Sequence, residues 1–189
     1  MSTNSEVRDR QRPLRILYRE HPAEAISRKW AGTTTAGAPA EDPFHGVVRI
    51  GRGYGISFRY GLDRGVGGLH DRPNPGDMLC AALAACLDSS VRMIANSLGI
   101  ELAELAVEVD GDVDLRGTLM VDPDVPVGFQ HLACTIRLRP AADPDERRLA
   151  RLIELAEQCC VNLSTLRAGV DVQTRVAGGS DLAAAPRSA

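Results

Sequence analysis

The sequence predicts an α+β fold, because it contains two long helical segments and several short alternating ones. Apolar residues recur with helical spacing over residues 74–98 and again over about 144–160. Alternation of apolar and polar residues marks the expected strands, which are 47–50, 56–60, 105–110, 129–139 and 170–176. Strands and helices are partly segregated along the chain, which favours α+β over a doubly wound parallel sheet.

The first long helix is the element around which the chain is organised. Asn74 is placed to act as its N-cap, and Pro75 suits the first helical position, where a missing N–H costs nothing. Asp77 lies in the first turn, where a carboxylate complements the positive end of the helix dipole. Gly99 is a natural stop, so the helix is expected to end at about Leu98.

One face of this helix is predicted to be buried and to carry a cysteine. At about 100° per residue, one apolar stripe contains Leu79, Ala82, Leu83, Cys86, Ser90, Met93 and Ile94. Asp77, Asp88 and Arg92 lie on the opposite face. A thiol in the middle of such a stripe is either an inert core residue or a sheltered reactive group. The wide apolar arc also indicates that more than one neighbour covers the helix, and a second subunit is a candidate.

The chain is predicted to form a single domain with an extension at each end. Residues 44–176 make up the domain, and 177–189 are expected to be a disordered tail. Residues 1–43 are an N-terminal extension, either partly disordered or an arm that wraps a partner subunit. Along this extension we expect a disordered stretch at 1–12, a short strand at 14–18, a brief helix or loop at 21–30, and a linker at 31–43.

A glycine-rich segment, GRGYG at Gly51–Gly55, connects the first two strands of the domain. A phosphate-binding glycine loop needs a strand before it and a helix after it. Here a second strand follows, so the segment is predicted to be a hairpin turn that uses the conformational freedom of glycine.

The second half of the chain is predicted to contain three more strands and one more helix. Residues 113–120 continue or pair with the strand at 105–110. In the strand at 129–139, Cys134 shares a side with apolar residues and is expected to be a small core residue. Asp143 and Pro144 are expected to cap the second long helix, whose apolar stripe ends at Cys160 if the helix lasts that far.

Composition and charge exclude several classes of function. The net charge is −3, so neither nucleic acid nor an anionic membrane is expected as the main partner. The sequence shows no run of about 18 apolar residues and no secretory signal, and it predicts a cytoplasmic protein. Five cysteines with irregular spacing predict neither a disulfide framework nor a structural zinc site. No bound metal or cofactor is expected.

Each long helix carries a cysteine in its apolar stripe, Cys86 on the first and Cys160 on the second, 74 residues later. Helices packed on one sheet can bring such stripes together. A peroxide-reducing thiol needs a stabilised thiolate and a second thiol that captures the sulfenic acid. Two inward cysteines with a basic neighbour would meet that need, although buried cysteines are also common as inert fillers.

Three stretches of the chain resemble the OsmC/Ohr family, the osmotically induced and organic hydroperoxide resistance proteins. NPGDMLCAALAACLDSSVRMIANSLGIELAELAVEVDGDVDLRG resembles the region of the first family cysteine, and LIELAEQCCVNLSTLRAGVDV resembles that of the second. VPVGFQHLACTIRL resembles the strand between them. The resemblance covers about residues 44–176, and residues 1–43 match nothing in the family.

The resemblance implies an intertwined homodimer and a thiol peroxidase that acts on organic hydroperoxides and hydrogen peroxide. By position, Cys86 would attack the peroxide and Cys160 would close a disulfide with it. Cys159 is a rival for the second role, but the spacing from Cys160 to Leu166 fits the family better. An external dithiol, of the lipoyl type in the better-known branches, would restore the thiols. Leu79, Leu83 and Met93 would line the substrate site.

The chain departs from the family pattern at one position. Many members carry Glu ten residues before the first cysteine, paired with an arginine that activates the thiol, whereas this chain has Gly76. Arg59 best matches the arginine, with Arg49 and Arg52 as alternatives. The missing Glu indicates a divergent OsmC-like branch, and it leaves open a non-catalytic stress or small-ligand-binding protein.

Overall fold

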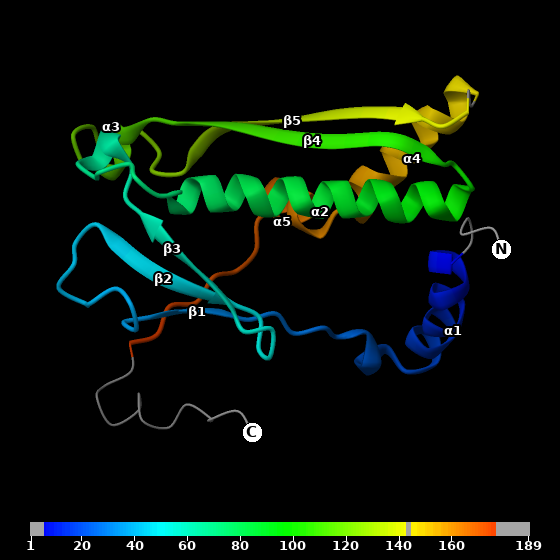
Figure 1. The fold of residues 1–189 in the computed structure, drawn as a ribbon, viewed down its shortest axis with the longest axis horizontal. Helices are drawn as coiled ribbons and strands as arrows, with labels where there is room; N and C mark the ends of the chain where they lie inside the picture. Colours follow the sequence, from blue (N-terminus) through cyan, green and yellow to red (C-terminus); the bar gives the residue numbers. More distant parts are fainter. Residues whose placement is uncertain (1–5, 143–144, 177–189) are drawn as a thin grey trace.

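A computed structural model describes residues 6–142 and 145–176, and it has the α+β architecture expected from the sequence. A long hairpin of β4 (Leu102–Val113) and β5 (Phe129–Pro140) runs along the central helix α2 (Pro75–Leu98). The helices α4 (Glu146–Cys159) and α5 (Val161–Ala168) also pack on α2 (Figure 1). The three-stranded sheet of β1 (Ala31–Thr34), β2 (His45–Ile50) and β3 (Ile56–Gly61) lies apart from this layer.

The capping residues predicted for α2 are confirmed. The Asn74 side chain accepts hydrogen bonds from the backbone N–H groups of Gly76 and Asp77, and the Asp77 carboxylate accepts one from the Asn74 N–H. This reciprocal capping box satisfies N–H groups that have no partner inside the helix. Gly99 ends the helix in the left-handed conformation, at φ 66°.

The buried face of α2 is rotated relative to the predicted stripe. The buried residues of α2 are Leu83, Leu87, Ser90, Val91 and Ala95. Leu79 and Ala82, which were expected inside, are exposed in the single chain. The side chains of α2 that pack against α4, α5 and β4 define the core, and sequence periodicity alone did not show where these elements would lie.

The core consists of two clusters strung along α2. One joins α2 to α4 through Val91, Ala95, Ile100, Leu152 and Ala156, and side chains of β4 and β5 pack over it. The other joins α2 to α5 through Leu83, Leu87, Cys160 and Leu163, with Cys86 packed against it. The second cluster therefore places two cysteines at the same helix contact.

The predicted hairpin turn at Gly51–Gly55 is confirmed. Strands β2 and β3 are antiparallel, with Ile50 opposite Ile56 at the closed end. Gly51, Gly53 and Gly55 all have positive φ, a conformation that residues with a Cβ rarely adopt.

The N-terminal extension is more structured than the sequence indicates. Helix α1 (Glu6–Glu20) replaces the disorder expected at residues 6–12 and the strand expected at 14–18, and residues 1–5 lie outside the described part of the chain. The Val7 N–H donates to Asn96 Oδ1 at 3.0 Å, so the start of α1 is tied to the end of α2. The brief helix is the 3₁₀ turn η2 (Pro22–Ala25), and β1 lies within the predicted linker.

In the second half, the helix predicted at about 144–160 is confirmed as α4, two predicted strands are wrong, and one helix was missed. The strand expected at 113–120 ends at Val113, and α3 (Leu115–Thr118) follows because the Asp114 side chain caps it. Cys160 ends α4 and begins α5, a helix that the sequence pattern did not reveal. Residues 170–176 form no strand, since nothing in the described chain pairs with them.

The N-cap of α4 is Asp145. The caps expected at 143–144 lie outside the described residues, as does the tail at 177–189.

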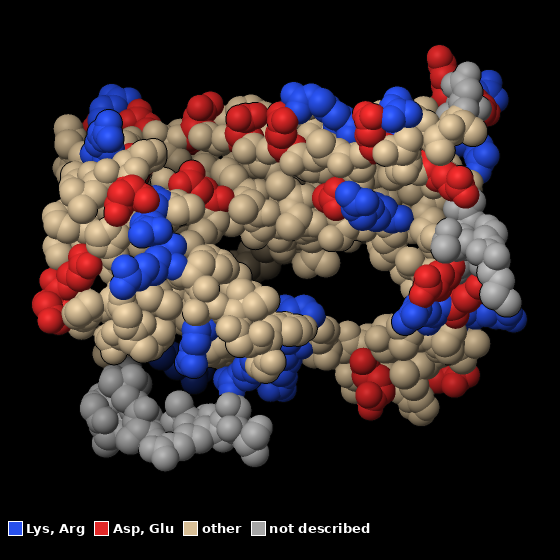
Figure 2. All heavy atoms as spheres, in the orientation of Figure 1, with Lys and Arg blue, Asp and Glu red and all other residues tan. Residues whose placement is uncertain are grey.

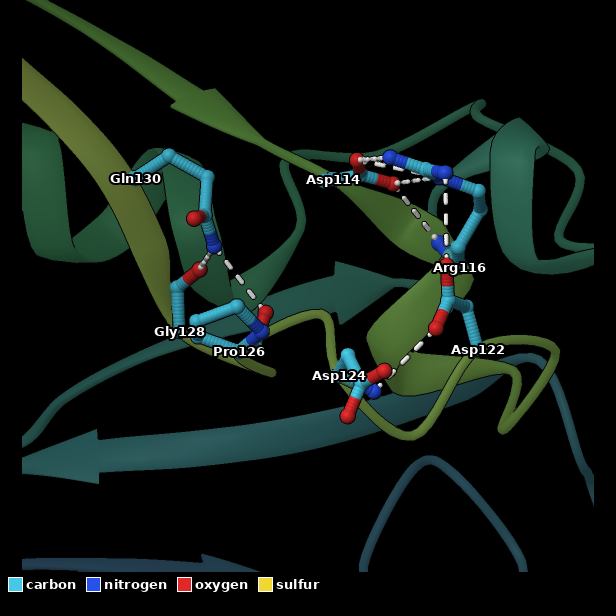
Figure 3. A network of polar contacts seen from close by, with 7 residues as sticks. All are labelled: Asp114, Arg116, Asp122, Asp124, Pro126, Gly128 and Gln130. Atoms are coloured by element: carbon cyan, nitrogen blue, oxygen red, sulfur yellow. Dashed lines mark hydrogen bonds and ion pairs between the residues drawn. The ribbon is translucent and has the colours of Figure 1, made fainter.

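Polar contacts hold the connection between β4 and β5. Figure 3 shows Arg116 bridging the carboxylates of Asp114 and Asp122, and Gln130 donating to the carbonyl oxygens of Pro126 and Gly128. These contacts fix the loop that closes one end of the long hairpin.

One helix in the described residues, α2, is long and apolar enough to cross a membrane by length and composition alone. The helix contains Asp88 and Arg92 in its middle, so it is not the continuous apolar run whose absence was noted from the sequence. Its contacts with β4, α4 and α5 are those of the central helix of a folded domain.

Candidate functional site

The structure brings the two sequence-predicted cysteines together. Cys86 lies in the middle of α2 and is half-buried, and Cys160 lies between α4 and α5 and is completely buried. Both side chains belong to one packed cluster, although the residues are 74 positions apart in the chain. Two cysteines packed against each other can join in a disulfide where their backbones lie within the distance that the bond requires.

The first turn of α5 supplies a hydrogen-bond donor to the Cys86 sulfur. The Asn162 backbone N–H donates to Cys86 Sγ at 3.5 Å, and the Asn162 side-chain amide donates to the carbonyl oxygen of Ala82 at 2.8 Å. The Ser90 hydroxyl donates to the Cys86 carbonyl oxygen at 3.0 Å. The Cys86 sulfur therefore lies at the start of α5, where backbone N–H groups have no acceptor within the helix.

Electrostatics distinguish the two thiols. Burial raises the pKa of Cys160, and the adjacent Cys86 raises it further. The backbone N–H of Leu163 and the hydroxyl of Ser90 lower the pKa of Cys160 in part. Cys160 therefore keeps its proton at neutral pH, where it can act as a donor toward Cys86 rather than as a competing thiolate.

The other cysteines lie outside this contact. Cys159 is exposed at the end of α4, so Cys160 is the residue that faces Cys86. Cys80 lines a different cavity, and burial followed by the charge of Asp77 raises its pKa. Cys134 is exposed on β5, so the prediction that it is a core residue is wrong. Its face of β5 is only partly covered by helices in the single chain.

The three candidate arginines are engaged with groups other than Cys86 in the described chain. The Arg59 guanidinium donates to the carbonyl oxygen of Gly37. Arg49 and Arg52 lie over the ring of Trp30, at 5.6 and 5.1 Å from its centroid. Such cation–π contacts explain why these side chains are held on the β1–β2 surface.

Gly76 is required by the cap of α2. Its N–H donates to Asn74 Oδ1 at 2.7 Å, and a Cβ at this position would lie 2.9 Å from the same oxygen and 3.4 Å from the Phe129 ring. A glutamate here would therefore disturb the capping box, which gives a local reason for the departure from the family pattern.

A cavity of about 960 Å³ lies between the three-stranded sheet and the first half of α2. Its apolar lining comes from Ala31, Val48, Ile50, Phe58, Pro73, Met78, Ala81 and Ala82. Arg59, Arg72 and Asp77 also border it. Ala82 is one helical turn before Cys86, so the cavity ends close to the cysteine pair.

The predicted substrate residues do not line this cavity. Leu79 is exposed elsewhere on α2, Met93 is two turns beyond Cys86, and Leu83 is in the core beside Cys160. The sequence reasoning missed Met78, Ala81 and Ala82, although their spacing of three and four positions places them on one helix face. Helical periodicity alone did not show which face the sheet would approach.

Residues 6–142 and 145–176 contain no group of three or more His, Cys, Asp or Glu side chains placed to hold a metal ion.

Solved structures share this fold. An OsmC-like protein from Mycoplasma pneumoniae matches with a TM-score of 0.59 and 12% identity, over 76% of this chain and 89% of that one. An organic hydroperoxide resistance protein from Elizabethkingia anophelis matches with a TM-score of 0.54 and 21% identity, over 76% and 91%. One from Legionella pneumophila has a TM-score of 0.55 and 20% identity, over 78% and 95%. A comparison with curated proteins found no significant match.

The family model described as OsmC-like protein matches residues 68–175, which is more than half of the chain and includes both cysteines of the site. The chain therefore belongs to the OsmC-like protein family.

Proposed function

We propose that this protein is a cysteine-based thiol peroxidase that reduces organic hydroperoxides and hydrogen peroxide through a Cys86–Cys160 disulfide. The observation that carries the proposal is the contact between the two thiols at the junction of α2 and α5. Membership of a family that includes organic hydroperoxide resistance proteins supports it.

In the proposed mechanism, the Cys86 thiolate attacks one peroxide oxygen and the O–O bond breaks. The alkoxide or hydroxide that leaves takes a proton and departs as an alcohol or as water, and Cys86 becomes a sulfenic acid. The Cys160 sulfur then attacks the sulfenic sulfur, the disulfide forms, and water leaves. An external dithiol reduces the disulfide by thiol–disulfide exchange and is itself oxidised to a disulfide.

The apolar cavity between the sheet and α2 is the proposed place for the organic part of the substrate. Its lining by Val48, Phe58 and Met78 suits an alkyl or aryl group. Arg59 and Arg72 at the border would hold a polar end of a longer hydroperoxide. These side chains replace Leu79, Leu83 and Met93 as our candidates for substrate contacts.

We further propose a cytoplasmic homodimer whose external reductant is a dithiol, of the lipoyl type in the first instance. Exposed large apolar side chains on the sheet and α2 support a second copy as a partner, among them Ile50, Ile56, Phe58 and Leu79. Figure 2 shows an opening between the α2 layer and the N-terminal segment, which a partner subunit would fill. Light scattering on the purified protein tests the assembly.

A second candidate is a non-catalytic stress or small-ligand-binding protein with the same fold. Gly76 favours it, because the Glu that many family members use is absent, and a side chain at this position would press on the Asn74 cap of α2. The candidate arginines are also paired elsewhere in the single chain.

Mass spectrometry after one equivalent of cumene hydroperoxide separates the two candidates. A peroxidase forms a Cys86–Cys160 disulfide within the first turnover, and Cys86→Ser abolishes it, whereas the exposed Cys134→Ser leaves it intact. A binding protein stays reduced, or oxidises slowly at exposed thiols such as Cys159.

A further inference from the structure

One residue, Asn162, makes two separate contacts across the junction of α2 and α5. Its backbone N–H reaches Cys86 Sγ at 3.5 Å, and its side-chain Nδ2 donates to the carbonyl oxygen of Ala82 at 2.8 Å. Ala82 is one turn before Cys86 on α2, so both contacts fall on the same stretch of that helix. Two bonds from one residue fix both the distance and the orientation of the donor.

We propose that Asn162 is the positioning residue for the Cys86 thiolate, with its side-chain amide locking α5 so that its own N–H points at the sulfur. The inference deepens the proposed peroxidase function and rests on it for its catalytic meaning. The placement itself is a property of the reduced protein and can be tested without a peroxide.

The position of Asn162 in α5 explains why its N–H is available. It is the second residue of the helix, and the first N–H groups of a helix have no acceptor within it. The Ser164 N–H, two residues later, already bonds to the Cys160 carbonyl oxygen at 2.9 Å. The sulfur of Cys86 thus accepts a bond from a donor that the helix leaves unused, and the helix dipole adds to the attraction for a thiolate.

The side chain of Asn162 suits this role by its length and its chemistry. The Ala82 carbonyl oxygen can accept a second hydrogen bond beside the one it takes within α2, because a carbonyl oxygen has two lone pairs. An ionised Asp at position 162 has no donor for it, and Ala has none either. Cys160 begins the same turn of α5, so the lock that orients the N–H also keeps the second thiol against Cys86.

This arrangement gives the chain a source of thiolate stabilisation that needs no Glu–Arg pair. Arg59, Arg49 and Arg52 bond elsewhere in the described chain, and Gly76 occupies the Glu position. A side-chain change other than to proline leaves the backbone N–H in place, but it can misalign that N–H. The reactivity of Cys86 therefore depends on how firmly α5 is held on α2.

The test measures the rate of Cys86 alkylation by iodoacetamide against pH, by site-resolved mass spectrometry on the full-length reduced protein. In Asn162→Ala, the midpoint of the Cys86 profile is expected to rise, because the N–H of residue 162 no longer points at the sulfur. Ser164→Ala, a change of an exposed residue on the same helix, is expected to leave the midpoint unchanged. Circular dichroism shows whether each variant is folded.

A folded Asn162→Ala with the wild-type midpoint overturns the proposal. If Asn162→Ala does not fold, Asn162→Gln decides instead, because its longer amide keeps the donor and misplaces the N–H, and an unchanged midpoint again overturns it. The peroxidase proposal fails separately, when the wild-type protein forms no Cys86–Cys160 disulfide with cumene hydroperoxide. A shifted midpoint in that case still supports the positioning role.

Discussion

The imidazole Nε2 of His45 lies 3.1 Å from Asp71 Oδ1, which ties the first residue of β2 to the loop that leads into α2. Its Nδ1 lies 3.0 Å from Asp42 Oδ2. Carboxylates only accept hydrogen bonds, so both ring nitrogens must donate, which only the protonated imidazolium can do. The hydrogen bonds that His45 donates to Asp42 and then to Asp71 accordingly raise the pKa of His45.

The contacts of His45 with Asp42 and Asp71, called the His45 clamp below, make the free energy of unfolding depend on pH. A raised His45 pKa contributes stability that is fully present below its ordinary value of 6.5 and is lost as the pH rises through the folded value. The carboxyl pKa values are lowered, for Asp42 first by the Phe44 N–H and for Asp71 first by His45. Their contribution is present above 3.8 and is lost as the pH falls through the folded values.

We therefore expect His45→Gln to lower the thermal unfolding midpoint more at about pH 5.5 than at about pH 8.5. The measurement is differential scanning fluorimetry of both proteins across that range. His131→Gln is the matched control, because His131 is exposed on β5. An equal loss at both pH values would show that the clamp is not an ionic one.

The assignment of the second thiol gives a prediction about overoxidation. In Cys160→Ser no intramolecular partner can capture the sulfenic acid at Cys86, so Cys86 is expected to gain a second and third oxygen under excess hydroperoxide. Catalytic turnover is lost in that variant. Intact-mass and peptide mass spectrometry measure both oxidation states.

Cys159→Ser is the matched control for this experiment, since Cys159 is the adjacent thiol and is exposed. It is expected to form the disulfide at the wild-type rate. Loss of the disulfide in Cys159→Ser, with retention in Cys160→Ser, would reverse our assignment.

The capping box of α2 gives a prediction about stability. Asn74→Ala removes the acceptor of the Gly76 and Asp77 N–H groups and is expected to cost about 1 kcal/mol of unfolding free energy. Urea denaturation followed by circular dichroism measures the change. Asn74→Ser keeps a capping oxygen and is expected to recover most of the loss, and equal destabilisation by both variants would argue against the cap as the cause.

The elements that the sequence predicted correctly are those with strong local signals. The cap at Asn74, the stop at Gly99 and the glycine turn at 51–55 all depend on neighbouring residues alone. The pairing of Cys86 with Cys160 was reached from helical stripes together with a family resemblance, and the structure brings these two side chains into contact. Caps, stops and turns can be predicted without knowledge of the fold, because they depend on residues that are close in sequence.

The parts that could not be predicted depend on contacts distant in sequence. Helix α1 has an unusually polar sequence with Pro13 inside it, and its tie to Asn96 could not be read from its own residues. The break at Cys160 that creates α5 has no Gly or Pro to mark it. For the same reason Asn162 carried no signal, because its importance comes from Ala82 and Cys86 on another helix.

The cavity beside α2 gives a last prediction, in which the structure and the helical periodicity favour different methionines as substrate contacts. Met78 lines the cavity and Met93 does not, whereas helical periodicity had favoured Met93. Met78→Gln is expected to lower kcat/KM for cumene hydroperoxide by about 10-fold or more, because a polar amide replaces an apolar contact with the aryl group. Its effect on hydrogen peroxide is expected to be small, since that substrate has no organic part.

Met93→Gln is the control variant and is expected to change neither rate. Assays coupled to the reductant, with both peroxides and both variants, measure the four rates. If Met93→Gln selectively impairs cumene hydroperoxide while Met78→Gln does not, the substrate lies along the Leu79–Met93 face of α2 and our cavity assignment is wrong.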